Sequence, residues 1–319
     1  MPETRGAFHA GERALQGALA ERMAEAGARA IRDHLPRQHR DFFAQLPFIV
    51  VGSLDAQGRP WASALASPPG FVQAPDEHTL RIGVLPLPGD PLAAALAPGA
   101  PLGLLGIEPA TRRRNRANGV VAQVDARGFG VAVRQSFGNC PRYIQAREAV
   151  FGGGAPAAPA EPLPALDAAA RALIARADTF FIATAHPDAR RAQAAAAEGV
   201  DVSHRGGRPG FVHVDEGDVL TVPDFDGNRY FNTLGNLLLH PHAGLLFIDF
   251  DGGGLLHLQA GAELVTDGPA LAAFEGAQRL LRLRVHGGLR RPGALPLRWG
   301  PAAPSPHLAA TGRWPASGI

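Results

Sequence analysis

The chain has 319 residues, 46% of them apolar, and its 31 basic and 29 acidic side chains leave a net charge of +2. This balance excludes a nucleic-acid-binding tail, and no apolar run reaches the roughly 20 residues of a membrane-spanning helix. All basic residues other than histidine are arginine and the only cysteine is Cys140, which excludes a Schiff-base lysine, a lysine-bearing phosphate loop, an internal disulfide and a cysteine-based metal cluster.

The chain opens with an alanine-, glutamate- and arginine-rich stretch that predicts one long helix over residues 9–35. Gly17 or Gly27 could break this helix, and Pro36 ends it.

Strands follow the helix. An apolar run at residues 48–54, a turn at 55–60 and a second run at 61–66 predict a β-hairpin. The further strands that we expect in the first half cover residues 78–84, 102–107, 120–125 and 129–134.

A Pro- and Gly-rich linker at residues 151–165 separates the chain into a first unit, 1–150, and a second unit, 166–319. The second unit should begin with a capped helix at 167–177 and contain a later helix at 230–240. The strands that we expect in it cover residues 179–185, 210–214, 219–222, 244–250, 255–264 and 279–286.

The two units repeat each other. Residues 47–107 and 179–248 share one order of apolar runs and turns, and the tetrapeptide PGFV recurs at 69–72 and 209–212. We therefore predict a mainly β protein in which two antiparallel barrels form a built-in dimer, with a ligand groove between them. Such a chain would be a monomeric pseudo-dimer or a homodimer.

Several segments resemble the pyridoxamine 5′-phosphate oxidase-like family of FMN-binding split barrels. The second unit carries DVSHRGGRPGFV at 201–212, VPDFDGNRYFNTLGNL at 222–237 and AGLLFIDF at 243–250. RRRNRANG at 112–119 and SFGNCPRYIQAR at 136–147 resemble the partner half of that family's tandem members. The resemblance implies two tandem FMN-binding split barrels.

The resemblance also implies where the cofactor phosphate binds: on a strand with basic and small polar residues, and at the start of the helix after the next strand. The positions that match are Ser203, His204, Arg205, Gly206, Pro223, Asn228, Arg229, Asn232 and Thr233. A helix N-terminus and arginine side chains suit phosphate oxygens on physical grounds as well. The alternatives are an exposed arginine- and glycine-containing turn and an ordinary capped helix.

From the first unit, the resemblance implies that a Cys-Pro-basic turn closes over the flavin. The positions are Asn139, Cys140, Arg142 and Tyr143, together with Arg116 and Asn118 from RRRNRANG. Alternatively, Cys140 is a small buried apolar residue, Tyr143 only packs, and RRRNRANG is a solvated basic turn.

Two departures bear on the reaction. Pyridoxamine phosphate oxidases proper have an arginine and lysine pair at the helix start, where this chain has Asn232 and Thr233. No residues in the C-terminal tail match those that bind the substrate phosphate in these oxidases, so we do not expect vitamin B6 oxidation.

Other kinds of site have little support. His240 and His242 flank a proline and are not spaced like the turn-separated ligands of a zinc helix, so we expect no metal. The acidic pairs Asp224 with Asp226 and Asp249 with Asp251 are interpreted as solvated loop residues.

The expected function is that of a cytoplasmic FMN-dependent oxidoreductase exchanging two electrons with a nicotinamide cofactor or small substrate. Longer relatives continue into a ferredoxin-reductase-like module after a tail similar to PSPHLAATGRW at 304–314. Electrons would therefore come from a free cofactor or a separate reductase partner.

Two alternatives remain. One is a non-enzymatic flavin- or haem-binding protein, in which an exposed histidine such as His204, His213 or His257 would ligate haem. The other is a structural barrel with an empty groove, for which Arg205→Ala and Asn232→Ala would change neither stability nor spectra.

Overall fold

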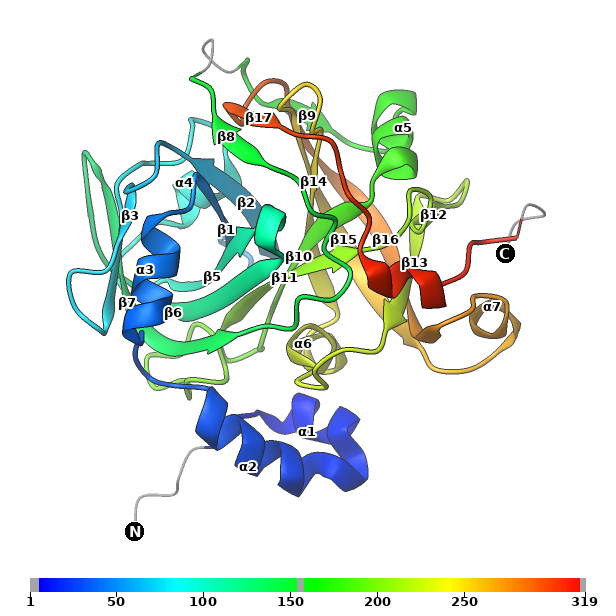
Figure 1. The fold of residues 1–319 in the computed structure, drawn as a ribbon, viewed down its shortest axis with the longest axis horizontal. Coiled ribbons are helices and arrows are strands. Elements are labelled where there is room, and N and C mark those ends of the chain that lie inside the picture. The colour runs from blue at the N-terminus through cyan, green and yellow to red at the C-terminus, as the bar shows by residue number, and fades with distance from the viewer. Residues whose placement is uncertain (1–5, 154–157, 316–319) are drawn as a thin grey trace.

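Two antiparallel sheets dominate the computed structural model, which describes residues 6–153 and 158–315. Strands make up 39% of the chain and helices 21%, so the predicted mainly β class is confirmed. Figure 1 shows the two sheets side by side, with the N-terminal helices below them.

The first sheet has seven strands in the order β2-β1-β5-β6-β7-β4-β3. The strands are β1 (Phe48–Leu54), β2 (Pro60–Ala66), β3 (Val72–Gln73), β4 (Thr79–Ile82), β5 (Pro101–Glu108), β6 (Arg113–Asp125) and β7 (Gly128–Gly138). The predicted hairpin is confirmed, with Phe48 opposite Ala66. RRRNRANG is no turn, because all but its first residue lie in the long strand β6.

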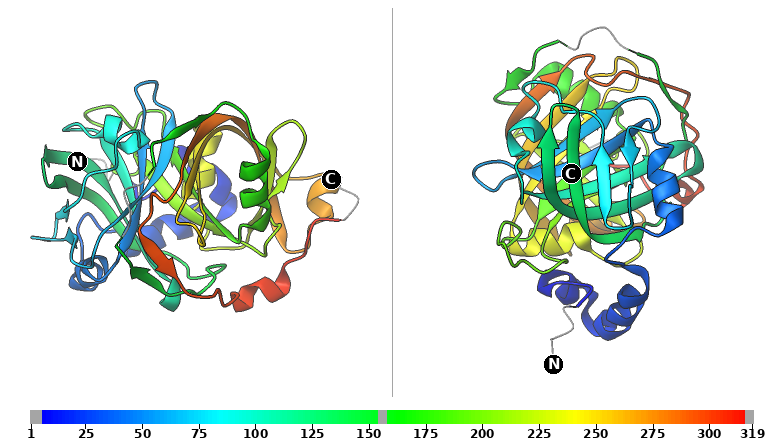
Figure 2. Two further views of the ribbon diagram at one scale, coloured as in Figure 1. Left: turned by 90° about the horizontal axis from the view of Figure 1, so that it is seen from above. Right: turned by 90° about the vertical axis from the view of Figure 1, so that its left-hand side faces the viewer.

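The second sheet follows the order β11-β10-β14-β15-β16-β13-β12, with β9 paired to β16. The strands are β9 (Glu161–Leu163), β10 (Thr179–Ala185), β11 (Val200–Gly206), β12 (His213–Val214), β13 (Val219–Phe225), β14 (His242–Ile248), β15 (Leu255–Val265) and β16 (Ala277–Arg291). Figure 2 shows this sheet curling around its own core.

The two sheets have the same topology. Counted from the first strand of its hairpin, each runs 2-1-5-6-7-4-3. Each also has a register shift at the corresponding place, between Asn118 and Gly119 in one sheet and between Gln259 and Ala260 in the other. The repeated sequence pattern therefore corresponds to a repeated fold.

The helices lie around these sheets. They are α1 (Ala10–Gln16), α2 (Ala20–Ala30), α3 (Arg37–Ala44), α4 (Pro91–Ala95), α5 (Ala168–Arg176), α6 (Asn232–Leu239) and α7 (Pro269–Ala272), with 3-10 helices at Gly17–Leu19, Pro109–Thr111 and Pro306–Ala310. The predicted N-terminal helix breaks at Gly17, where φ is +52°, and ends at Ala30. Helix α3, which begins directly after Pro36, was not predicted from the sequence.

The predicted linker is partly ordered into strands. At its start β8 (Ala149–Phe151) pairs with β17 (Leu297–Trp299), and near its end β9 joins the second sheet. Residues 154–157 of this linker lie outside the described residues.

Each sheet covers its own apolar core, and a third apolar cluster lies between the sheets. This cluster joins Phe48, Val50 and Leu105 of the first sheet to Phe181 and Leu246 of the second. These side chains alternate with those that face each sheet's own core, as the period of a β-strand requires. The strands in the middle of the molecule are therefore buried on both faces.

Glycines make the contact between the sheets reciprocal. A Cβ atom on Gly103 would lie 2.4 Å from the Val200 carbonyl oxygen, and one on Gly244 would lie 2.4 Å from that of Pro60. Gly103 of the first sheet thus packs against the start of β11, and Gly244 of the second sheet packs against the start of β2. Such mutual contacts are typical of a two-fold interface.

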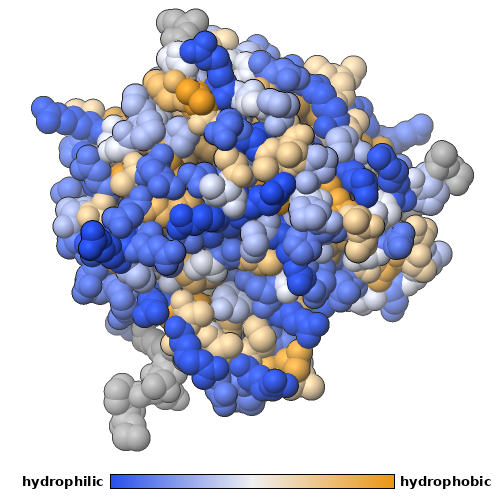
Figure 3. Space-filling model, in the orientation of Figure 1, coloured by the Kyte–Doolittle hydropathy of each residue, from blue (hydrophilic) through white to orange (hydrophobic). Residues whose placement is uncertain are grey.

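The surface is mixed in character. On the face shown in Figure 3, hydrophilic side chains predominate and apolar ones form small separate groups. Within the described residues, no helix is long and apolar enough to cross a membrane.

Candidate functional site

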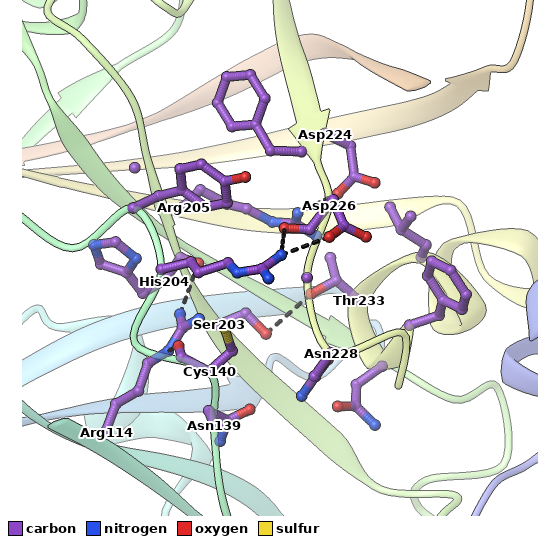
Figure 4. Close-up of a pocket in the computed structure, with 18 of the residues that line it drawn as sticks. Arg114, Asn139, Cys140, Ser203, His204, Arg205, Asp224, Asp226, Asn228 and Thr233 are labelled. Carbon is purple, nitrogen blue, oxygen red and sulfur yellow. Dashed lines mark hydrogen bonds and ion pairs between the residues drawn. The ribbon is translucent and has the colours of Figure 1, made fainter. Parts of the chain in front are cut away.

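A large pocket opens where the two sheets meet, and Figure 4 shows its lining. The space that it encloses, together with its part open to solvent, is about 900 Å³. All the predicted cofactor residues line it except Asn118. Residues that are far apart in the sequence therefore meet at one place.

Arg205 reaches across the pocket from β11 to the end of β13. Its Nη1 lies 2.5 Å from Asp224 Oδ1, and Arg279 Nη1 lies 3.2 Å from the other oxygen of that carboxylate. Asp224 is 5% exposed, so its interpretation as a solvated loop residue was wrong. The Nε atom of Arg205 is buried and has no partner among the described residues, which leaves a donor for a ligand.

A second arginine joins the two sheets beneath the pocket. Arg116 of β6 donates through Nη1 to Asp201 Oδ1 at 2.8 Å and through Nη2 to the Ser203 hydroxyl at 2.5 Å. Asn118 donates to the same Asp201 oxygen at 2.7 Å, so it holds this carboxylate rather than facing the cavity. Thr233 of α6 in turn donates to the Ser203 hydroxyl at 3.0 Å.

Arg114 is a pocket residue that the sequence reasoning missed. Its Nε donates to the Cys140 carbonyl at 2.7 Å and its Nη1 to the His204 carbonyl at 3.3 Å. No carboxylate among the described residues lies within 4.0 Å of it, so its charge is not neutralised locally. Burial, and then Arg116 and Arg205, lower the pKa of Arg114 to about 10, which keeps it charged at neutral pH.

The segment after β7 forms the opposite wall. Asn139 and Cys140 are half-buried there, and the Asn139 amide nitrogen has no partner among the described residues. Cys140 is thus neither fully buried nor exposed. Tyr143 packs its ring 4.9 Å from that of Phe225, at the pocket rim.

The loop before α6 has an unusual backbone. Arg229 and Phe231 both have a φ of +59°, a region that non-glycine residues rarely occupy and that is enriched at functional sites. Asp226 in this loop accepts from Arg142 at 2.5 Å, which connects the loop to the first half of the chain. Asn228 and Arg229 themselves are exposed.

Helix α6 points its N-terminus into the pocket. Its first residues, Asn232, Thr233 and Leu234, all line the cavity, and Phe231 at the N-cap position supplies no side-chain cap. The first N–H groups of a helix have no partner within the helix and carry a partial positive charge. This end of α6 is therefore suited to an anion.

The pocket lining is positively charged overall. It contains five arginines, Arg114, Arg116, Arg142, Arg205 and Arg229, and only two carboxylates, Asp224 and Asp226. Together with the helix start and the unpartnered donors of Arg205 and Asn139, this charge matches an anionic ligand rich in acceptor oxygens.

Comparison with known proteins identifies part of the chain. Residues 166–289, from before α5 into β16, match the family model described as pyridoxamine 5′-phosphate oxidase. This segment is thus similar to the pyridoxamine 5′-phosphate oxidase-like family. No curated protein matches the chain.

Three similar solved structures each cover between 36% and 39% of the chain. HupZ of Group A Streptococcus is 12% identical, with 37% of this chain and 93% of that chain covered and a TM-score of 0.27. HutZ, described as the heme storage protein of Vibrio cholerae, is 16% identical over 39% and 93%, with a TM-score of 0.26. An F420 reductase is 18% identical over 36% and 91%, with a TM-score of 0.25.

The pyridoxamine 5′-phosphate oxidase-like segment does not complete the pocket by itself. It supplies β11, the end of β13 and the start of α6, whereas β6 and the segment after β7 precede it in the chain. Arg114, Arg116 and Asn139 therefore come from outside the matched residues. The pocket is a composite of both halves.

The N-terminal helix α1 reaches the back of this segment, which sequence reasoning also missed. Glu12 of α1 is 2% exposed and accepts a hydrogen bond from the Asn232 side chain. Burial and the nearby Asp201 carboxylate raise the pKa of Glu12 well above its usual range. The side chain of Asn232 is thus already engaged, and its contribution to a ligand would come from the backbone.

The histidines do not form an exposed ligand set. His204 and His257 are 5% and 0% exposed, and the His213 ring packs 6.1 Å from that of Trp314. Groups of three or more metal-ligating side chains are absent from the part of the chain that the structure describes.

Burial of His204 should make the protein sensitive to mild acid. Burial, with Arg114 and Arg205 nearby, lowers the pKa of His204 well below its usual value. The unfolded chain binds a proton there below about pH 6.5, so this contribution to stability is lost as the pH falls from 6.5. Between pH 6 and 5, the unfolding free energy of the unaltered protein should therefore fall with pH. In His204→Gln we expect this fall to be smaller by up to about 1.4 kcal/mol per pH unit.

The measurement is urea unfolding of both proteins at pH 7.5, 6 and 5. Glu12, with its raised pKa, acts in the opposite direction, so the difference between the two proteins is compared rather than either slope alone. Parallel slopes would contradict a neutral buried His204.

Proposed function

We propose that this chain is an FMN-binding flavoprotein and that the composite pocket is its flavin site. The observation that carries this proposal is the convergence of five arginines and an uncapped helix start on a cavity shared by both halves. Pyridoxamine 5′-phosphate oxidase-like proteins typically bind flavin or haem. FMN agrees with this lining better than haem, because His204, the histidine of the lining, is 5% exposed and so is poorly placed to ligate an iron in the pocket.

Different residues of the pocket suit different parts of FMN. Arg205, the Ser203 hydroxyl and the first N–H groups of α6 would hold the phosphate. The Asn139 amide would donate to acceptor oxygens elsewhere on the cofactor. Tyr143 and Phe225 give the pocket an aromatic rim against which a flat ring can pack.

We further propose that the protein is an oxidoreductase. Bound FMN supplies two-electron transfer, so the protein needs only to position the ring and a reaction partner. The partner that we propose is a nicotinamide cofactor or a small oxidisable substrate, with a separate reductase as an alternative electron source. Arg142 and Arg229 share one carboxylate, that of Asp226, and the positive charge left over at this side of the pocket would attract such an anionic cofactor.

The first experiment is an absorption spectrum of the freshly purified protein, followed by heat release and identification of any bound molecule. We expect flavin bands, release of FMN rather than FAD, and about one FMN per chain after saturation. We expect a stoichiometry of one because the five arginines converge on this single pocket.

Other outcomes would reject this proposal. A sharp Soret band would identify the protein as a haem binder, whereas a colourless protein that fails to quench added FMN fluorescence would have no flavin site. Bleaching of the flavin bands by NADH or NADPH under anaerobic conditions would support turnover. A flavoprotein that neither reagent nor a purified reductase bleaches would be a binding protein only.

A further inference from the structure

A second groove lies on the first sheet, in the position equivalent to the flavin pocket. It has a volume of about 750 Å³, including its open part, and its walls come from β2, the segment after β4, β15 and the segment after β16. The flavin pocket uses β11, the end of β13, β6 and the segment after β7. Each wall that one half of the chain supplies to the flavin pocket is thus supplied to the second groove by the other half.

The strand registers establish which residues correspond. Val51 lies opposite Ser63 and Leu104, as Ile182 lies opposite Ser203 and Leu245. Leu104 then pairs with Ala117, and Leu245 with Leu258. Counting along the strands from these pairs makes His257 the counterpart of Arg116, Leu255 that of Arg114, and Leu65 that of Arg205.

The same counting extends to the remaining walls. Ala117 pairs with Ser136 and Leu258 with Gly288, so Arg291 is the counterpart of Asn139. Gln73 opposite Arg81 matches His213 opposite Thr221, so Val84 is the counterpart of Asp224. The polar side chains that hold charge in the flavin pocket are thus apolar in the second groove, at Leu65, Val84 and Leu255.

The second groove does contain one cation, Arg291, at the position that Asn139 has in the flavin pocket. Arg291 is 2% exposed and lines this groove. Its Nη1 donates to the Pro88 carbonyl at 2.9 Å, while its Nε is buried without a partner in the described residues. No carboxylate of the described residues lies within 4.0 Å of it either. A buried guanidinium with unused donors is costly unless a ligand satisfies it.

One carboxylate, that of Asp90, lies in the lining of this groove. Asp90 accepts from the Ser63 hydroxyl at 2.6 Å and from the Leu92 N–H at 3.0 Å, at the N-cap of α4. Both bonds occupy the same oxygen, Oδ1, of this carboxylate, which also lines the groove. The groove therefore combines apolar walls with one available cationic donor.

We propose that this second groove binds a small organic anion with an apolar body, whose acidic oxygens are held by Arg291. The half-exposed Leu85 and Leu87 would cover the apolar body at the mouth of the groove. The groove is unsuited to a flavin phosphate, because apolar residues stand at the positions equivalent to Arg205, Arg114 and Asp224. This inference does not depend on the proposed flavin function, because the two cavities share no lining residue.

The test compares two fluorescent probes that share one apolar body: 8-anilinonaphthalene-1-sulfonate, which is anionic, and N-phenyl-1-naphthylamine, which is neutral. For the full chain we expect the anionic probe to bind at least about tenfold more tightly, the effect of one charge-assisted hydrogen-bonding group. Arg291→Met should abolish this preference. Leu87→Glu, at a position 39% exposed, should weaken both probes without unfolding the chain.

Arg205→Ala is the control for the other cavity. Anionic-probe binding that responds to Arg205→Ala but not to Leu87→Glu would locate the probe in the flavin pocket and overturn the proposal. Equal affinities of the two probes for the unaltered protein would also overturn it. If Arg291→Met fails to fold, a loss of the anionic probe in Leu87→Glu, with its binding unchanged in Arg205→Ala, supports the proposal by itself.

Discussion

Replacing Arg205 with alanine should weaken FMN binding by about 10- to 100-fold, the range expected for one lost charge-assisted hydrogen-bonding group. The substitution removes the cation that spans the pocket and leaves the buried Asp224 carboxylate paired with Arg279 alone. A carboxylate with less compensation would also repel a phosphate. The measurement is a titration of apoprotein with FMN, followed by quenching of flavin fluorescence.

Arg282→Ala is the matched control, because Arg282 lies on β16 and its one ion-pair partner among the described residues is the exposed Glu263. It should leave the FMN affinity unchanged. Asn232→Ala should have a smaller effect than Arg205→Ala, since the Asn232 side chain already donates to Glu12. If both Arg205→Ala and Asn232→Ala bind FMN like the unaltered protein, the phosphate site that we propose is wrong.

Replacing Arg116 with methionine should lower the free energy of unfolding by about 3–5 kcal/mol, the cost of removing one member of a buried ion pair. The side chains of Arg116 and Asp201 are 3% and 7% exposed, and they connect β6 of one half to β11 of the other. Without the arginine, the Asp201 carboxylate remains buried near Glu12 with only amide donors. Urea unfolding at pH 7.5 in the absence of flavin measures the effect.

Arg81→Ala serves as its control. Arg81 pairs with Asp125, whose side chain is 50% exposed, and surface pairs contribute about 0–1 kcal/mol. A loss for Arg116→Met no greater than that of Arg81→Ala would mean that Asp201 is solvated or protonated once its partner is removed.

Much of the fold could be predicted from the sequence where its signals are local. The β1–β2 hairpin has an alternating pattern and a tight turn, and the helix at α5 has its own cap, with Asp167 accepting from Ala170 N–H. The strand β6 was only half predicted, because its first residues are arginine and asparagine. These polar side chains are buried by partners from the other half, such as Asp201, which no local pattern reveals.

The candidate site shows the same division. The predicted residues of the two motifs could be found by family resemblance and do line one pocket: Ser203 to Gly206, Asn228, Arg229, Asn232 and Thr233. Glu12 contacts Asn232 across 220 positions of sequence, and Asp224 becomes a buried partner only once β11 and β16 bring Arg205 and Arg279 to it. Such contacts follow from the packing of the sheets and not from spacing.

The apolar cluster between the sheets also has a consequence for biosynthesis. Its first members, Phe48, Val50 and Leu105, leave the ribosome well before their partners Phe181 and Leu246. At about 5–20 residues per second, synthesis of the second half adds on the order of ten seconds. During that interval the nascent first sheet exposes the apolar face that the second sheet covers in the complete protein. A chain released at the linker would therefore be prone to aggregate, and chaperone binding to ribosome-bound intermediates should peak just before the second sheet is complete.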